Sequence, residues 1–206
     1  MRQFLTIVIL GTVLQAVIGC ASTQPSRFYV LTDLSDHVAP PQAATAGQGP
    51  AVGVGPITFP KYLDRPQIGS RASRYELTFA EFQRWAEPLD TNFSRALVEH
   101  LAQLIPTDRM AVFPWPRGMA IDYQVTAEVV HFFGQIGGTS SLIANWSIFR
   151  KEGGEALVSR TSRLSAAASG PQYEAMVAAM SQTVAELSGE IATAMRTVAA
   201  AHASGR

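Results

Sequence analysis

The chain has 206 residues, 47% of them hydrophobic, and its 16 basic residues balance its 16 acidic ones, so its net charge is zero. The charge balance excludes the strongly basic surface of a nucleic-acid-binding protein, so no nucleic-acid partner is expected. The hydrophobic content excludes an intrinsically disordered chain and is enough for one globular domain.

The first 19 residues have the pattern of a secretory signal peptide. Met1-Arg2-Gln3 gives a short cationic start, and an apolar stretch over residues 4–18 follows it. This stretch is shorter than the ~20 apolar residues of a spanning helix, and three polar residues interrupt it. We therefore predict a segment, residues 1–19, that is removed during export.

The predicted cleavage site resembles the lipobox of bacterial lipoproteins. Val17-Ile18-Gly19-Cys20 places two aliphatic residues and a small residue before a cysteine whose thiol accepts a diacylglyceryl group. Cys20 is the only cysteine, so it cannot form an internal disulfide. We expect lipidation at Cys20, with an ordinary signal or anchor segment as the alternative. In bacterial lipoproteins an Asp directly after the cysteine tends to retain the protein at the inner membrane. Ala21 stands at that position here, so we expect the protein at the outer membrane, facing the periplasm.

The first half of the mature chain begins with a tether, residues 20–26, whose six residues after the cysteine reach about 20 Å when extended. Strands are predicted over residues 27–31, 51–59 and 73–79, and a Pro-, Ala- and Gly-rich loop over residues 35–50. Leucine and phenylalanine recur at spacings of four and three between Leu89 and Leu104, which predicts an amphipathic helix over residues 88–105.

The second half contains a short strand over residues 110–113 and a long alternating strand over residues 121–133. Two further strands, 142–148 and 156–166, complete a three-stranded meander. A long helix over residues 171–198 then carries an apolar stripe. The last residues, 199–206, are predicted to be a flexible tail.

These elements predict one domain, residues 27–198, with six or seven strands and two helices. Each helix has a single apolar stripe, so each needs a sheet face that buries it. The predicted fold class is α/β or α+β, with a mixed sheet on which a central helix and a long C-terminal helix pack.

The sequence contains few motifs that are typical of catalytic or metal-binding sites. No Gly-x-Ser-x-Gly occurs, and the four histidines have no metal-ligand spacing. Ser140 and Ser141 fall at a turn, without a sequence sign of a base near them. We predict a non-enzymatic protein without cofactor or metal. An enzyme whose site assembles from scattered residues is an alternative.

Two segments combine residue types that are enriched at binding hot spots. Tyr62 and Arg65 lie between prolines after the second predicted strand, and Arg84 and Trp85 lie just before the central helix. As interface residues, these four would bind a partner. As packing residues, Trp85 would lie beneath the helix start, and Arg84 or Arg65 would pair locally with an acidic neighbour, Glu87 or Asp64.

The same two segments carry a family resemblance. Tyr62-Leu63-Asp64-Arg65-Pro66-Gln67-Ile68 and Arg84-Trp85-Ala86-Glu87-Pro88-Leu89 resemble the paired signature of the ABC-type transport auxiliary lipoproteins, the PqiC (YmbA-like) family. In that family a lipobox precedes a Phe-Tyr-x-Leu strand, which Phe28-Tyr29-Val30-Leu31 matches here. The resemblance covers essentially the whole mature chain and implies a domain similar to the N-terminal domain of TolB.

The resemblance also implies the partners. These are an MCE-domain protein and its membrane subunit, which move lipids or other hydrophobic molecules between membranes, with energy from a separate subunit. Assembly into a homo-oligomeric ring is a further implication. We therefore expect an outer-membrane adapter with Tyr62, Arg65, Arg84 and Trp85 as candidate interface residues. The alternative is a module that itself holds a lipid or apolar ligand in a pocket.

Overall fold

The structure, a computed structural model, describes residues 24–32, 49–73, 75–151 and 154–204. The predicted signal peptide, Cys20 and most of the predicted loop over residues 35–50 lie outside the described residues. In chain order, the elements are β1 (Arg27–Tyr29), β2 (Val52–Thr58), the 3-10 turn η1 (Lys61–Leu63), β3 (Gln67–Arg71), β4 (Leu77–Trp85), α2 (Leu89–Leu104), β5 (Met110–Val112), β6 (Tyr123–Phe133), β7 (Thr139–Arg150), β8 (Ala156–Ala167) and α3 (Tyr173–Ser204).

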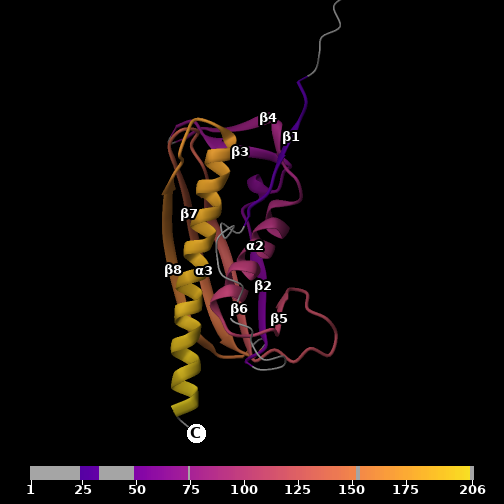
Figure 1. Cartoon of the computed structure of the whole chain (residues 1–206), viewed down its shortest axis with the longest axis vertical. Helices are drawn as coiled ribbons and strands as arrows, with labels where there is room; N and C mark the ends of the chain where they lie inside the picture. The colour runs from indigo at the N-terminus through magenta and orange to yellow at the C-terminus, as the bar shows by residue number, and fades with distance from the viewer. Residues whose placement is uncertain (1–23, 33–48, 74, 152–153, 205–206) are drawn as a thin grey trace, which may run out of the picture.

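The larger sheet has five strands in the order β5-β2-β6-β7-β8 (Figure 1). β6, β7 and β8 form the predicted antiparallel meander, with Val125 opposite Ile148 and Ile148 opposite Val158. β2 pairs in parallel with β6 on one side and with β5 on the other. The sheet is therefore mixed, as predicted.

Both helices lie on the same face of this sheet (Figure 1), where α2 covers β2 and β5 and α3 covers β7 and β8. Their apolar stripes are buried against alternating strand residues, and Phe93 of α2 meets the ring of Phe132 edge-on at 5.4 Å. Burial of these stripes is the main stabilising contribution to the fold. The buried core includes Phe93, Leu97, Leu101, Leu142, Ala144, Trp146, Ile148, Met176, Met180, Val184, Leu187 and Ile191.

The smaller sheet closes one end of the molecule and was only partly predicted. β1 pairs in parallel with β4, and β4 pairs antiparallel with β3. β3 lies in a segment for which no strand was predicted, and the strand predicted over residues 73–79 lies instead at Leu77–Trp85. This strand was missed because Gln67–Arg71 is short, and its partner β4 becomes apparent only in the folded chain.

The C-terminal helix is longer than predicted. α3 continues beyond residue 198 to Ser204, so part of the segment expected to be a flexible tail is helical. Its last turns extend past the sheet (Figure 1). Within the described residues, neither helix combines the length and apolar character needed to span a membrane.

Candidate partner-binding surface

The two motif segments form adjacent strands at the end of the molecule that the smaller sheet closes. The first segment supplies η1 and the start of β3, and the second supplies the end of β4. Gln67 pairs with Arg84, and the backbone N–H of Trp85 donates to the carbonyl oxygen of Pro66 at 2.7 Å. Segments about twenty residues apart in sequence are thus joined into one structural unit.

Trp85 is buried within this unit, with 5% of its surface exposed. Around a small internal crevice its neighbours include Leu63, Leu89 and Met180. The indole therefore packs at the start of α2, as the packing alternative predicted. An effect of Trp85 on a partner would act through the position of the surface residues above it.

Tyr62 and Arg65 are more accessible, and each is positioned by an aromatic ring. The Tyr62 ring stacks on Phe133 with centroids 5.7 Å apart and planes 9° from parallel, and 40% of Tyr62 is exposed. The guanidinium carbon of the exposed Arg65 lies 4.1 Å from the ring centroid of Phe79, a cation–π contact. Both side chains are therefore held in defined positions at the surface.

Arg84 is half-buried, and its Nε donates to the carbonyl oxygen of Glu81 at 3.4 Å. Glu87 does not pair with Arg84 as the packing alternative suggested. It instead accepts hydrogen bonds from Arg95 at 2.6 Å and from Asn92 at 2.5 Å. Arg95 lies on the first turns of α2, which brings its guanidinium back over the helix start.

The bonds to Glu87 change its acidity. The hydrogen bond from Arg95, followed by that from Asn92, lowers the pKa of the Glu87 carboxyl below its ordinary value of 4.5. Glu87 therefore stays ionised and fixes the amide of Asn92. The second polar atom of that amide, Oδ1, accepts the backbone N–H of Leu31 at 2.6 Å.

This network ties the motif to the first strand. Besides the bond to Leu31, the backbone N–H of Ala86 donates to the carbonyl oxygen of Tyr29 at 2.9 Å, and the Tyr29 hydroxyl donates to Gln83 at 2.8 Å. The strand that follows the tether is therefore fastened to the domain by Ala86 of the second motif segment and by Gln83 and Asn92 on either side of it. This connection was not predicted from the sequence.

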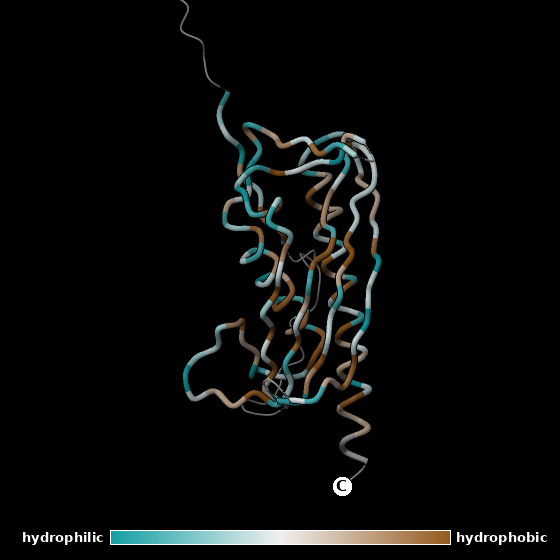
Figure 2. Tube along the Cα trace, turned by 180° about the vertical axis from the view of Figure 1, so that it is seen from behind, coloured by the Kyte–Doolittle hydropathy of each residue, from teal (hydrophilic) through white to brown (hydrophobic). Residues whose placement is uncertain are grey.

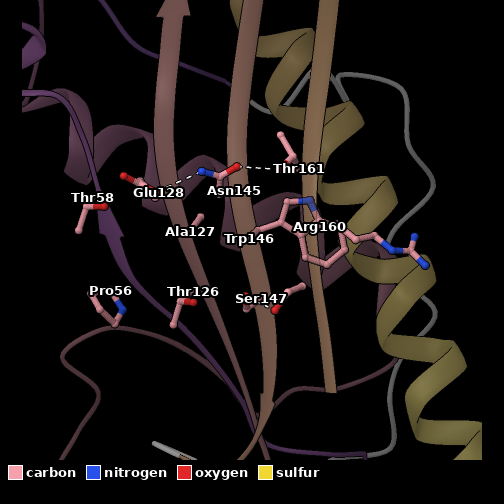
Figure 3. Close-up of a pocket in the computed structure, with 11 residues that line it drawn as sticks. Pro56, Thr58, Thr126, Ala127, Glu128, Asn145, Trp146, Ser147, Arg160 and Thr161 are labelled. Carbon is pink, nitrogen blue, oxygen red and sulfur yellow. Dashed lines mark hydrogen bonds between the residues drawn. The ribbon is translucent and has the colours of Figure 1, made fainter. Parts of the chain in front are cut away.

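The face of the larger sheet opposite the helices contains a hollow of about 640 Å³ (Figure 3). Glu128, Asn145 and Thr161 form a row across β6, β7 and β8 (Figure 3), in which Asn145 donates to Glu128 at 3.2 Å and Thr161 donates to Asn145 at 2.8 Å. Ser147 and Ser159 form a parallel hydroxyl pair at 2.9 Å. A view from behind looks onto this face (Figure 2). Its polar row does not suit a purely apolar ligand.

A second hollow of about 460 Å³ lies where the short strand β5 ends beside β2. Its apolar lining includes Val54, Ile57 and Phe113, and Asp90 and Arg95 of α2 line it as well. Phe113 is 43% exposed and meets Trp115 edge-on at 5.2 Å. This groove combines apolar surface with a few charged groups, which is the composition of a small-molecule site.

One pair of residues has the composition of a catalytic dyad. Nε2 of His131 lies 2.7 Å from Oγ of Ser141, a contact that the sequence analysis missed because β6–β7 register creates it. Nδ1 of His131 faces the Arg71 guanidinium at 3.4 Å. Burial, followed by the charge of Arg71, lowers the pKa of His131 below its ordinary value of 6.5. A cation at this position disfavours the imidazolium that a general base must become.

The described residues contain no group of three or more His, Cys, Asp or Glu side chains arranged to hold a metal ion. The features described above are a first strand fastened to the domain, a motif unit of paired strands and two open hollows. Together they describe an α+β domain whose surfaces are suited to binding.

Comparison with known proteins assigns this domain to a family. The sequence model of the ABC-type transport auxiliary lipoprotein component matches residues 29–192. The chain therefore belongs to the family of ABC-type transport auxiliary lipoproteins, as the resemblance predicted. Membership in this family of lipoproteins implies that the protein is anchored to a membrane. A comparison with curated proteins found no match.

Two solved structures share the fold. A crystal structure of an uncharacterized protein superposes with a TM-score of 0.65 at 22% identity, covering 84% of this chain and 99% of the other. Protein XCC0632 from Xanthomonas campestris, of family DUF330, superposes with a TM-score of 0.63 at 16% identity, covering 88% of this chain and 98% of the other. These likenesses confirm the single-domain α+β fold with a long C-terminal helix.

Proposed function

We propose that the protein is an outer-membrane-anchored, periplasmic and non-enzymatic accessory component of an MCE-type transport system. The family match over residues 29–192 is the observation that carries the proposal, because it places the chain with transport auxiliary lipoproteins. In this proposal Cys20 carries the lipid, and the domain docks an MCE-domain protein and its membrane subunit. A homo-oligomeric ring is the proposed form in which it docks.

The structure supports the adapter role through the way that the first strand is fastened. Leu31 is fully buried, and its backbone is bonded to α2 only eleven residues after Cys20. Because this rigid attachment lies so close to the lipidated cysteine, it holds the domain near the membrane surface. Tyr62, Arg65 and Arg84 are the proposed partner contacts, and buried Trp85 is the residue that positions them.

The adapter proposal is tested by recovery of partners from solubilised membranes, using lipidated wild-type protein and mass spectrometry. Arg65→Ala and Tyr62→Ala are expected to abolish recovery of the MCE-domain protein while the thermal midpoint stays near that of wild type. Arg163→Ala is the matched control, because Arg163 is an exposed arginine on β8. Normal recovery with both motif variants would exclude these residues from the interface. Absence of any MCE-domain protein from the wild-type sample would contradict the adapter role itself.

The membrane assignment has its own test. Density-gradient fractionation is expected to place wild-type protein in the outer membrane. Ala21→Asp is expected to retain it in the inner membrane, because an Asp after the lipidated cysteine blocks sorting. Wild-type protein in the inner-membrane fraction would contradict the assignment.

The alternative function, a module that itself holds a lipid or apolar solute, rests on the groove lined by Val54, Ile57 and Phe113. Its volume falls within the range of ligand pockets, roughly 300–1,000 Å³. Native mass spectrometry of the purified protein is expected to retain a bound lipid if this alternative holds, and Phe113→Asp should release it. Protein that carries no lipid beyond its anchor would exclude the alternative.

A further inference from the structure

Exposed aromatic and aliphatic side chains lie along the end of the molecule from which the N-terminal segment emerges. Among the described residues, Tyr75 is 90% exposed and Phe28 is 64% exposed. Phe28 lies in β1 and Tyr75 in the hairpin between β3 and β4, and both elements lie at this end (Figure 1). Ile136, which is 41% exposed, follows β6 in the turn before β7.

Hydrogen bonds place the Ile136 turn beside the same hairpin. Ser70 forms a bridge with Gly134, and the backbone N–H of Arg71 donates to the carbonyl oxygen of Gly134 at 3.1 Å. Phe28, Tyr75 and Ile136 therefore belong to one end of the domain, here termed the end face. Water contact with large apolar side chains is unfavourable, so a surface that presents several of them is often a contact surface.

The length of the tether identifies what the end face meets. Phe28 is eight positions after Cys20, a span of at most about 26 Å when the chain is fully extended. Any less extended tether brings the end face closer to the bilayer. Tyr is enriched in the headgroup region, where its ring is shielded and its hydroxyl stays hydrated, and Phe is one of the apolar residues that interfacial segments bury there. A lipid surface is thus within reach without any change in the fold.

The charges at this end fit a zwitterionic or weakly anionic surface. Arg27 is exposed and supplies a donor for lipid phosphates, whereas Glu76 and Glu81 are exposed acidic residues on the same small sheet and hairpin. The opposing signs make net electrostatic attraction weak. Insertion of aromatic side chains, rather than charge, is therefore the main source of contact.

We propose that the end face, defined by Phe28, Tyr75 and Ile136, rests in the headgroup region of the membrane that carries the anchor. This inference rests on the lipid anchor of the proposed function and adds an orientation to it. The long axis of the domain then points away from the membrane. β5 and the C-terminal end of α3 lie at the opposite end of the domain (Figure 1), which then faces the periplasm.

The test uses full-length lipidated protein in vesicles of phosphatidylethanolamine and phosphatidylglycerol. Cys20 is the only native cysteine and its thiol carries the lipid, so Phe28→Cys, Tyr75→Cys and Arg117→Cys each offer one site for an environment-sensitive fluorophore. Arg117 is the control, because it is exposed in the loop that follows β5, away from the end face, and outside the groove of the alternative function. Spin-labelled lipids serve as the quencher.

Blue-shifted emission and quenching at positions 28 and 75, with water-like unquenched emission at position 117, is the expected result. Equal, water-like emission at all three positions in protein that floats with the vesicles would overturn the proposal and leave the anchor intact. Blue-shifted emission that lipid quenchers do not affect would also overturn it, because a protein surface would then cover the end face. Protein that fails to float would overturn the anchor, and the orientation with it.

A second variant separates insertion from labelling effects. Phe28→Ser combined with Tyr75→Ser, with the fluorophore at Ile136→Cys, is expected to lose most of the lipid quenching seen at position 136 with the native aromatics. Both aromatic residues are exposed, so the fold should persist, and circular dichroism checks this. Undiminished quenching at position 136 in the double variant would overturn the role of the aromatics.

Discussion

The side chain of Asn92, on α2, accepts the backbone N–H of Leu31, which lies 61 positions earlier, at 2.6 Å. Both residues are fully buried, and the same amide donates to Glu87. A buried amide with both of its polar groups satisfied fixes two chain segments in one arrangement. The first strand, the second motif segment and the central helix are therefore joined at this one residue.

Asn92→Ala is expected to destabilise the protein by about 1–3 kcal/mol, because it leaves the buried N–H of Leu31 without its acceptor. Denaturant unfolding followed by circular dichroism measures this loss. Thr91→Ala is the control, since Thr91 is exposed and its substitution should change the free energy of unfolding very little. Equal stability of both variants would show that the Asn92 network contributes nothing.

Ser162→Ala is expected to lower stability by about 1–3 kcal/mol, because Trp146 is buried and its indole Nε1–H donates to Ser162 at 2.7 Å. Ser162 in turn donates to Glu190 of α3, so the substitution also removes a link between β8 and the helix. Ser159→Ala, in an exposed hydroxyl pair on the other face, provides the comparison. A smaller loss for Ser162→Ala than for Ser159→Ala would contradict this account.

Gly134→Ala is expected to destabilise the protein by about 1–3 kcal/mol through overpacking. A Cβ at this position would lie 2.2 Å from Cγ of Met176, a fully buried residue in the first turns of α3. Gly189→Ala, in the interior of α3, meets no atom within 4 Å and is expected to stabilise the helix by up to about 1 kcal/mol. Thermal unfolding of the two variants should therefore shift in opposite directions.

Stability is expected to fall as the pH drops below 6.5, in part because of His131. Its pKa in the folded protein lies below the ordinary value of 6.5, chiefly through burial and then through the charge of Arg71. The unfolded chain thus binds a proton at a higher pH than the folded one. The contribution of His131 to the free energy of unfolding is fully present above pH 6.5 and is lost as the pH falls through the lower pKa of the folded state.

Denaturant midpoints above and below pH 6.5 measure this dependence, with His131→Gln as the variant without the titrating ring. The wild type should lose more stability on acidification than the variant. Arg71→Gln should lose less stability on acidification than the wild type, because it removes the cation that opposes protonation of His131. Identical pH dependence of wild type and His131→Gln would show that His131 does not titrate differently in the folded state.

The sequence alone determined the elements whose side chains repeat with a clear period. The spacing from Leu89 to Leu104 gave α2, and the alternation along residues 121–133 and 142–148 gave two strands of the meander. These patterns are local, because a helix or a half-buried strand places every fourth or every second residue on one face. The family resemblance was likewise local, since it depended on two short motifs.

Only the tertiary structure decided which strands pair and what the motif residues do. β3 could not be recognised without β4, and β2 lies between β5 and β6 although β5 and β6 come much later in the chain. The contact of His131 with Ser141 depends on strand register, and the bond of Asn92 to Leu31 joins residues far apart in sequence. Trp85 and Tyr62 are both hot-spot residue types, yet the fold buries one and exposes the other. Burial is set by the packing of distant segments, which residue spacing does not encode.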